Sequence, residues 1–251
     1  MTRVCFIGDS HLATLKFGLA SIAEDFPDIE ATFFASYGKT MRDLTLSGNR
    51  IVAGSESLAS SLERTSNGRT AIDDNFDVYF IHGLELSLAV PLLMIRDLKT
   101  DPTLPEWPPQ DGDGSFRKGL RTTLRRSISG RILKMLREIT RAPVFLSPAP
   151  VSSQQLPALR ERLVRREETM RLVEMFETEC NALARRMNAI FIPQPLVTRD
   201  ADGVATRPVY SQSPARFNAA LAVVEDKSHM NAEYGAAVLR DFLRAASLLP
   251  R

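Results

Sequence analysis

The sequence predicts an α/β protein in which a mostly parallel, five-stranded sheet is covered by helices on both faces. Short apolar runs without alternation recur along the 251 residues, as in strands that are buried on both faces. Segments with apolar residues at steps of three and four separate these runs, which is the pattern of amphipathic helices. A composition of 44% hydrophobic and 25% charged residues is that of a globular chain with a sizeable core.

Five apolar runs are predicted as the strands of this sheet. They cover residues 4–7, 31–35, 78–81, 144–146 and 189–192. Strands that alternate with helices imply parallel neighbours covered on both sides. In such sheets, ligands bind at the carboxyl ends of the strands, so we expect a functional site at that edge.

The predicted helices share apolar side chains at steps of three and four. One follows the first strand, one precedes the fourth strand, and one begins near Asn231 and closes the chain. Their apolar positions are Leu12, Leu15, Leu19, Ile22 and Phe26 in the first, Phe116, Leu120, Leu124, Ile128 and Ile132 in the second, and Tyr234, Val238 and Phe242 in the third.

We predict one domain, residues 1–251, because no repeat or long low-complexity segment divides the chain. Residues 100–114, TDPTLPEWPPQDGDG, carry four prolines and two glycines, so we expect a loop there. Two interpretations of this loop stay open. One is a plain surface excursion, and the other is a lid over a pocket with Trp107 as its apolar contact.

Charge gives no argument for a polyanionic partner. Lys and Arg total 32 against 30 Asp and Glu, and a net charge of +2 predicts neither nucleic-acid binding nor attachment to an anionic membrane. Nine basic residues stand between positions 117 and 141 with the single acid Glu138. A solvated helix face and a site for an anionic glycan or phosphate both fit that stretch.

Cysteine content and the first residues bear on the compartment. Cys5 and Cys180 form no spaced framework for a disulfide or metal. Only four apolar residues stand between Arg3 and Gly8, too few for the core of a signal peptide. We therefore expect a soluble, cytoplasmic protein; the sequence says nothing about its oligomeric state.

The first strand breaks into polar residues within FIGDSHL, residues 6–12. Ser10 lies between a strand and a helix, so its N–H is near the positive end of the helix dipole, where developing negative charge is stabilised. A Gly-Asp-Ser turn is equally a common helix cap. We expect Asp9 to fix the turn by bonding backbone N–H groups. His11 does not face Ser10 on a helix, and both pocket lining and a first-turn surface position fit it.

A second polar cluster stands just before the last predicted helix. Asp226 and His229 are three residues apart, so in a turn the carboxylate can hold one imidazole nitrogen while the other faces outward, as a general base requires. A histidine oriented in this way and a serine at a helix start are the minimum set for acyl transfer. That chemistry requires no metal or cofactor.

FIGDSHL and DKSHMN, residues 226–231, resemble the first and last sequence blocks of the SGNH, or GDSL-type, hydrolases. The resemblance spans the chain and implies a flavodoxin-like three-layer α/β/α fold. It implies Ser10 as nucleophile, His229 as base and Asp226 as the acid. The implied substrates are esters, especially acyl groups such as O-acetyl on carbohydrates or small molecules. An O-acyltransferase with the same acyl-enzyme, and a catalytically weakened binding protein on this fold, are the alternatives.

The internal blocks of the family match less fully. ASYGKT supplies Gly38 where the second block offers a glycine N–H to the oxyanion, and IHGLEL supplies Gly83 of the third block. Glu85 stands where that block usually has an asparagine whose amide is another oxyanion donor. An ionised carboxylate donates no hydrogen bond and repels an oxyanion.

His82, at the end of the third predicted strand, is our candidate for the missing donor. An imidazole N–H reaches about as far as an amide, and loss of one oxyanion donor typically costs about 2.7–4 kcal/mol of transition-state stabilisation. The other interpretation of His82 is a histidine that caps the strand end through backbone contacts.

Overall fold

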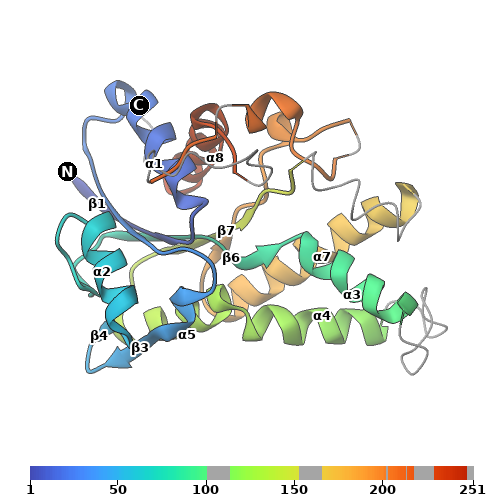
Figure 1. The fold of residues 1–251 in the computed structure, drawn as a ribbon, viewed down its shortest axis with the longest axis horizontal. Coiled ribbons are helices and arrows are strands. Elements are labelled where there is room, and N and C mark those ends of the chain that lie inside the picture. Colours follow the sequence, from blue (N-terminus) through green and yellow to red (C-terminus); the bar gives the residue numbers. More distant parts are fainter. Residues whose placement is uncertain (101–113, 153–165, 202, 213, 218–228, 248–251) are drawn as a thin grey trace.

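The computed structural model describes residues 1–100, 114–152, 166–201, 203–212, 214–217 and 229–247 (Figure 1). Its main sheet has five strands in the order β2-β1-β6-β7-β8, and all four neighbouring pairs are parallel. Each strand overlaps one of the five predicted apolar runs, which confirms the predicted fold class. The strands are β1 (Thr2–Gly8), β2 (Ile29–Ala35), β6 (Val78–Ser87), β7 (Val144–Ala149) and β8 (Ile190–Phe191).

Helices cover both faces of this sheet, as Figure 1 shows. On one face lie α1 (Leu12–Ser21) and α8 (Ala232–Ala245), side by side. The opposite face packs against the remaining α-helices. These are α2 (Glu56–Thr65), α3 (Ala89–Thr100), α4 (Gly114–Arg126), α5 (Ile128–Ile139) and α7 (Arg166–Arg186), and the short 3-10 helices are η1 (Ala23–Asp25), η2 (Thr40–Asp43), η3 (Leu196–Thr198) and η4 (Pro208–Ser211).

A row of aromatic rings forms the core under α1 and α8. Phe33, Phe6, Phe80 and Phe145 are register partners on four adjacent strands, and Phe242 of α8 packs against three of these rings. Rings in such contact bury large apolar areas and prefer the offset or edge-on geometries seen here. The next row toward the carboxyl edge contains Gly8 and His82 instead, so polar side chains begin where the core ends.

A second, smaller sheet was not predicted. It is antiparallel, in the order β3-β4-β5, with β3 (Leu44–Ser47), β4 (Arg50–Ala53) and β5 (Ala71–Ile72). The signal for it is Gly48-Asn49, a two-residue loop between two short strands; Gly48 has a φ of 59°, as hairpin turns of this length require.

Two of the predicted helical patterns differ from the structure in extent. The first helix ends at Ser21, so Phe26 lies beyond it, after η1. The pattern from 116 to 132 covers two helices, α4 and α5, which part at Ser127. Ser127 accepts a hydrogen bond from the Gly130 N–H at 3.1 Å and thereby caps α5, because a serine hydroxyl satisfies a free N–H of the first turn.

The predicted Pro/Gly-rich loop falls mostly outside the described residues. Positions 101–113, with Trp107, are not described, so both interpretations of this loop stay predictions. Its two end residues, Thr100 and Gly114, belong to α3 and α4. None of the described helices is long and apolar enough to cross a lipid bilayer.

The backbones of α1 and α8 touch at two glycines. A Cβ on Gly235 would lie 1.9 Å from the Thr14 carbonyl oxygen, and one on Gly18 would lie 2.4 Å from the Ala236 nitrogen. The buried Thr14 hydroxyl also donates to the Met230 carbonyl at 3.0 Å. This close crossing places the start of α1 beside the start of α8, at the carboxyl edge of the sheet.

We expect Gly235→Ala to destabilise the protein by about 1–3 kcal/mol or more, because the added methyl overlaps a backbone oxygen and the helices must separate. The free energy of unfolding in urea measures this. Gly114→Ala is the matched control, since a Cβ there meets no atom within 4 Å; its stability should be unchanged or slightly raised. Equal stability of the two variants would contradict the close crossing.

Candidate active site

Ser10 and His229 are in contact, although 219 residues separate them. The Nε2 of His229 lies 2.8 Å from the Ser10 Oγ, which is the distance that a nucleophile and its base require. Ser10 sits between β1 and α1, and His229 precedes Asn231, whose side chain caps α8 by accepting the Tyr234 N–H at 3.1 Å. The two helix starts thus present the hydroxyl and the imidazole to each other.

The predicted acid of this site, Asp226, lies outside the described residues. The structure therefore brings together two of the three residues to which the resemblance assigns the triad. The orientation of His229 by Asp226 stays a prediction, and so do the catalytic roles of Ser10 and His229.

Asp9 ties the serine turn to the neighbouring strand. One carboxylate oxygen accepts the His11 N–H at 3.0 Å, as expected for a side chain that fixes its own turn. The other accepts the Leu84 N–H at 3.1 Å. Ser10 is therefore anchored to the segment that follows the central part of β6.

That segment, Gly83–Glu85, has a left-handed backbone. The φ angles of Gly83, Leu84 and Glu85 are 71°, 57° and 66°, and the register between β6 and β7 shifts between His82 and Ser87. A Cβ on Gly83 would lie 3.2 Å from the Asp9 carboxylate, so another residue there would crowd that carboxylate as well as strain the positive φ. The turn directs Glu85 away from the regular ladder.

His82 lies beneath the serine turn and is fully buried. It pairs in register with Gly8 and with Ser147. Burial, with a smaller repulsion from His11, lowers the pKa of His82 to about 3, so the ring is neutral at pH 7. Both ring nitrogens are out of reach of solvent and meet no hydrogen-bond partner among the residues that the structure describes.

The buried position of His82 bears on both of its predicted roles. A direct bond to a substrate oxygen needs a ring nitrogen at the surface of the site, which this arrangement does not present. Within the described part of the chain, the His82 ring also makes no hydrogen bond that would cap the end of the strand. The role of His82 as an oxyanion donor stays a prediction, and the geometry favours a supporting place behind the site.

His11 borders the pair that Ser10 and His229 form. Its ring centroid is 4.9 Å from that of His229, with an angle of 36° between the planes. Of the two interpretations of His11, the structure favours a residue that lines the site. All three histidines of the chain thus lie around the start of α1, as the electrostatic effect of His11 on His82 also indicates.

Gly38 and Glu85 lie on the two sides of β1. Gly38, with a φ of 57°, is in the loop after β2, whose last residue, Ala35, pairs with Gly8. Glu85 accepts hydrogen bonds from the Arg42 guanidinium and from the Ile128 N–H, the latter at 3.1 Å. Its carboxylate is therefore engaged by two partners that the sequence did not reveal.

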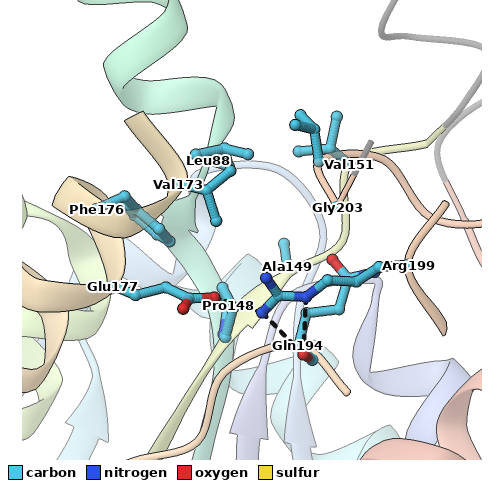
Figure 2. A pocket seen from close by; sticks show the side chains of 11 residues that line it. Leu88, Pro148, Ala149, Val151, Val173, Phe176, Glu177, Gln194, Arg199 and Gly203 are labelled. Atoms are coloured by element: carbon cyan, nitrogen blue, oxygen red, sulfur yellow. Dashed lines mark hydrogen bonds and ion pairs between the residues drawn. The ribbon is translucent and has the colours of Figure 1, made fainter. Parts of the chain in front are cut away.

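Two hollows lie near this edge of the sheet. A cavity of about 20 Å³, shown in Figure 2, lies between β7 and α7 and has room for about one water molecule. The Arg199 guanidinium crosses it, donating to the Gln194 carbonyl and pairing with Glu177. A wider hollow of about 570 Å³ has a volume typical of small-molecule sites. It is lined by Arg207, Val209, Tyr210, Gln212, Asn231, Ala232 and Glu233.

No group of three or more His, Cys, Asp or Glu side chains suited to a metal ion occurs in the part of the chain that the structure describes. Cys5 and Cys180 are both buried as free thiols.

Comparisons with known proteins give distant structural likenesses. No family model and no curated protein matches the sequence. Among solved structures, the chain is similar to the lipase Lip_vut3 from a goat rumen metagenome, with 12% identity over 99% of this chain and 98% of that one, and a TM-score of 0.47. An extracellular lipase from Streptomyces rimosus has 11% identity over 98% of this chain and 100% of that one, with a TM-score of 0.49.

A third likeness is the periplasmic domain of a lipopolysaccharide acetyltransferase from Salmonella ser. Paratyphi A, with 11% identity over 98% of this chain and 83% of that one, and a TM-score of 0.46. The sheet order and the place of Ser10 between β1 and α1 are those that the SGNH resemblance implies. The chain therefore has the flavodoxin-like α/β/α fold that this resemblance implies.

We expect the buried His82 to cost stability in acid. Below about pH 6.5, the unfolded chain protonates this histidine, whereas the folded protein does not until about pH 3. Stability therefore falls as the pH drops through this window, by up to about 1.4 kcal/mol per pH unit. His82→Phe removes this contribution, so its free energy of unfolding should fall less steeply than that of the wild type between pH 6.5 and 4. If the free energies of unfolding of the wild type and His82→Phe fall in parallel between pH 6.5 and 4, His82 is not buried in its neutral form. Between pH 7 and 8, where the histidine is neutral in both states, the two slopes should agree.

Proposed function

We propose that the protein is a serine esterase that hydrolyses acyl esters, including O-acetyl esters, of a carbohydrate or small molecule. The observation that carries this proposal is the 2.8 Å contact between the Ser10 hydroxyl and the His229 imidazole. A serine is a weak nucleophile unless an adjacent base takes its proton. The contact supplies that base at the carboxyl edge of a parallel sheet, where substrates bind.

The chemistry proceeds in two halves. His229 takes the Ser10 proton while the Oγ attacks the ester carbonyl, and the imidazolium then gives the proton to the departing alcohol, which leaves an acyl group on Ser10. A water molecule enters, loses a proton to His229 and attacks the acyl carbon. The carboxylic acid departs, and the proton returns to Ser10. Asp226 is proposed to hold the second imidazole nitrogen throughout.

The oxyanion of each tetrahedral intermediate needs donors near Ser10. The first turn of α1 begins with the Leu12 N–H donating to the Asp9 carbonyl and the Ala13 N–H donating to the Ser10 carbonyl. The Ser10 N–H precedes these bonds and lies at the positive end of the helix, so we propose it as one donor. The Gly38 N–H is proposed as another, from the loop after β2.

The presence of Glu85 in place of asparagine does not favour the catalytically weakened binding protein. Its carboxylate is held by Arg42 and by the first N–H of α5, which offset its charge. The hollow of about 570 Å³ is lined in part by Asn231, two residues after His229, and we propose that the alcohol part of the ester lies there. A cytoplasmic location stays a prediction.

Labelling with a serine-directed phosphonate tests this proposal. We expect a single adduct on Ser10 by peptide mass spectrometry, together with turnover of a chromogenic short-chain ester. Ser10→Ala and His229→Gln should each lower kcat by at least about 10³-fold, because removal of either member disables the pair. Ser21→Ala, the same change later on α1, is the control and should leave kcat unchanged.

If well-folded protein is not labelled at Ser10 and turns over no ester of the several acyl lengths tried, the esterase proposal is refuted and the binding protein is favoured. Acyl product that partitions to an added sugar rather than to water would favour the acyltransferase.

A further inference from the structure

The turn Gly83–Glu85 is a strained segment that must be held by its surroundings. Leu84 and Glu85 are non-glycine residues with φ angles of 57° and 66°. Such residues persist only where neighbouring contacts fix them, and they concentrate at functional sites. The contacts that fix this turn therefore identify the residues that hold the backbone beside Ser10 in place.

One side of the turn is fixed by groups already described. The Asp9 carboxylate accepts the Leu84 N–H, and the Leu84 side chain is 1% exposed within the core. Because Asp9 precedes Ser10, any shift of the turn is transmitted to the serine.

The other side is fixed by Glu85. Its carboxylate, in a side chain 26% exposed, accepts the Ile128 N–H at 3.1 Å at the first residue of α5. That location suits a negative charge, since the free N–H groups and the helix dipole both favour it. The second partner of the carboxylate is the Arg42 guanidinium.

Arg42 belongs to the loop that contains Gly38. It lies in η2, four residues after that glycine, and its own carbonyl accepts a hydrogen bond from the Arg131 guanidinium at 3.2 Å. The next residue, Asp43, accepts the Ser55 hydroxyl at 2.9 Å. The Gly38 loop is thus tied to α5 and to the start of α2.

The two loops that Arg42 and Glu85 connect lie on opposite sides of Ser10. β2 and β6 are the two neighbours of β1 in the sheet, and Gly8 pairs with Ala35 on one side and with His82 on the other. An ion pair between the loop after β2 and the turn after His82 therefore spans the end of β1, where the serine stands.

We propose that Arg42 and Glu85 are a positioning pair for the reaction at Ser10. The pair holds the loop of Gly38 at a fixed distance from the turn of Gly83 and neutralises a carboxylate that would otherwise repel the oxyanion. Neither residue contacts the reacting atoms. This inference rests on the proposed esterase function.

A double-mutant cycle with Arg42→Met and Glu85→Gln tests the pair. Arg42→Met leaves an unpaired carboxylate beside the site, so kcat should fall by about 10- to 100-fold with little change in KM. Glu85→Gln keeps an oxygen that accepts the Ile128 N–H, so its kcat should fall less than that of Arg42→Met. The kcat of the double variant should be within about threefold of that of Glu85→Gln, because the double variant contains no unpaired charge. Arg42→Lys, which keeps the charge, should retain most of the activity.

The double variant separates the two parts of this role, since activity that returns on adding Glu85→Gln to Arg42→Met reports the unpaired charge, and the loss of kcat that remains reports the missing link between the loops. Arg244→Met, which breaks the exposed ion pair with Asp241 on α8, is the control and should leave kcat unchanged. Unfolding in urea confirms that each variant is folded, and the rate of phosphonate labelling at Ser10 gives a second readout of the site.

Two failures are distinguishable. A wild-type protein with neither turnover nor labelling at Ser10 overturns the esterase proposal and this role with it. Wild-type turnover combined with single variants of full activity overturns the positioning pair alone, and a double variant no better than Arg42→Met overturns the part that Glu85 neutralisation plays in it.

Discussion

The site depends on the close crossing of α1 and α8. Only glycine at positions 18 and 235 lets the two backbones approach this far, and the Thr14 hydroxyl fixes their relative position by donating to the Met230 carbonyl. Because Met230 follows His229 directly, this buried hydrogen bond also fixes the position of the His229 backbone relative to α1. A sequence separation of 219 residues is thereby reduced to a contact by helix packing rather than by a flexible loop.

Asp9 extends this arrangement into the sheet. Its two carboxylate oxygens bind the N–H groups of His11 and Leu84, so the serine turn is held both to its own helix and to β6. Beneath it, Gly8 leaves room for Leu12, which a Cβ at position 8 would approach to 3.1 Å. Ser10 is thus supported by groups with few alternative positions, as preorganised sites require.

The sequence predicted the sheet, because buried strands leave local patterns, and it predicted the contact between Ser10 and His229 because the blocks that hold them resemble the first and last blocks of one hydrolase family. The hairpin at Gly48 was missed because its two strands are only four residues long each. The glycines at 18 and 235 leave no readable signal either. Within a helix, a glycine indicates only a weaker propensity, and its purpose becomes visible only when the opposing backbone is in place.

Glu85 shows why a residue type alone does not determine its effect on a site. The sequence predicted repulsion of an oxyanion, which holds for a carboxylate that faces the substrate unpaired. The left-handed φ of Glu85 instead sends the side chain to Arg42 and Ile128, each 43 residues away along the chain. A carboxylate between a guanidinium and a helix start has most of its field offset locally. The effect of a glutamate in place of the family's asparagine therefore depends on the tertiary partners of its carboxylate, Arg42 and Ile128.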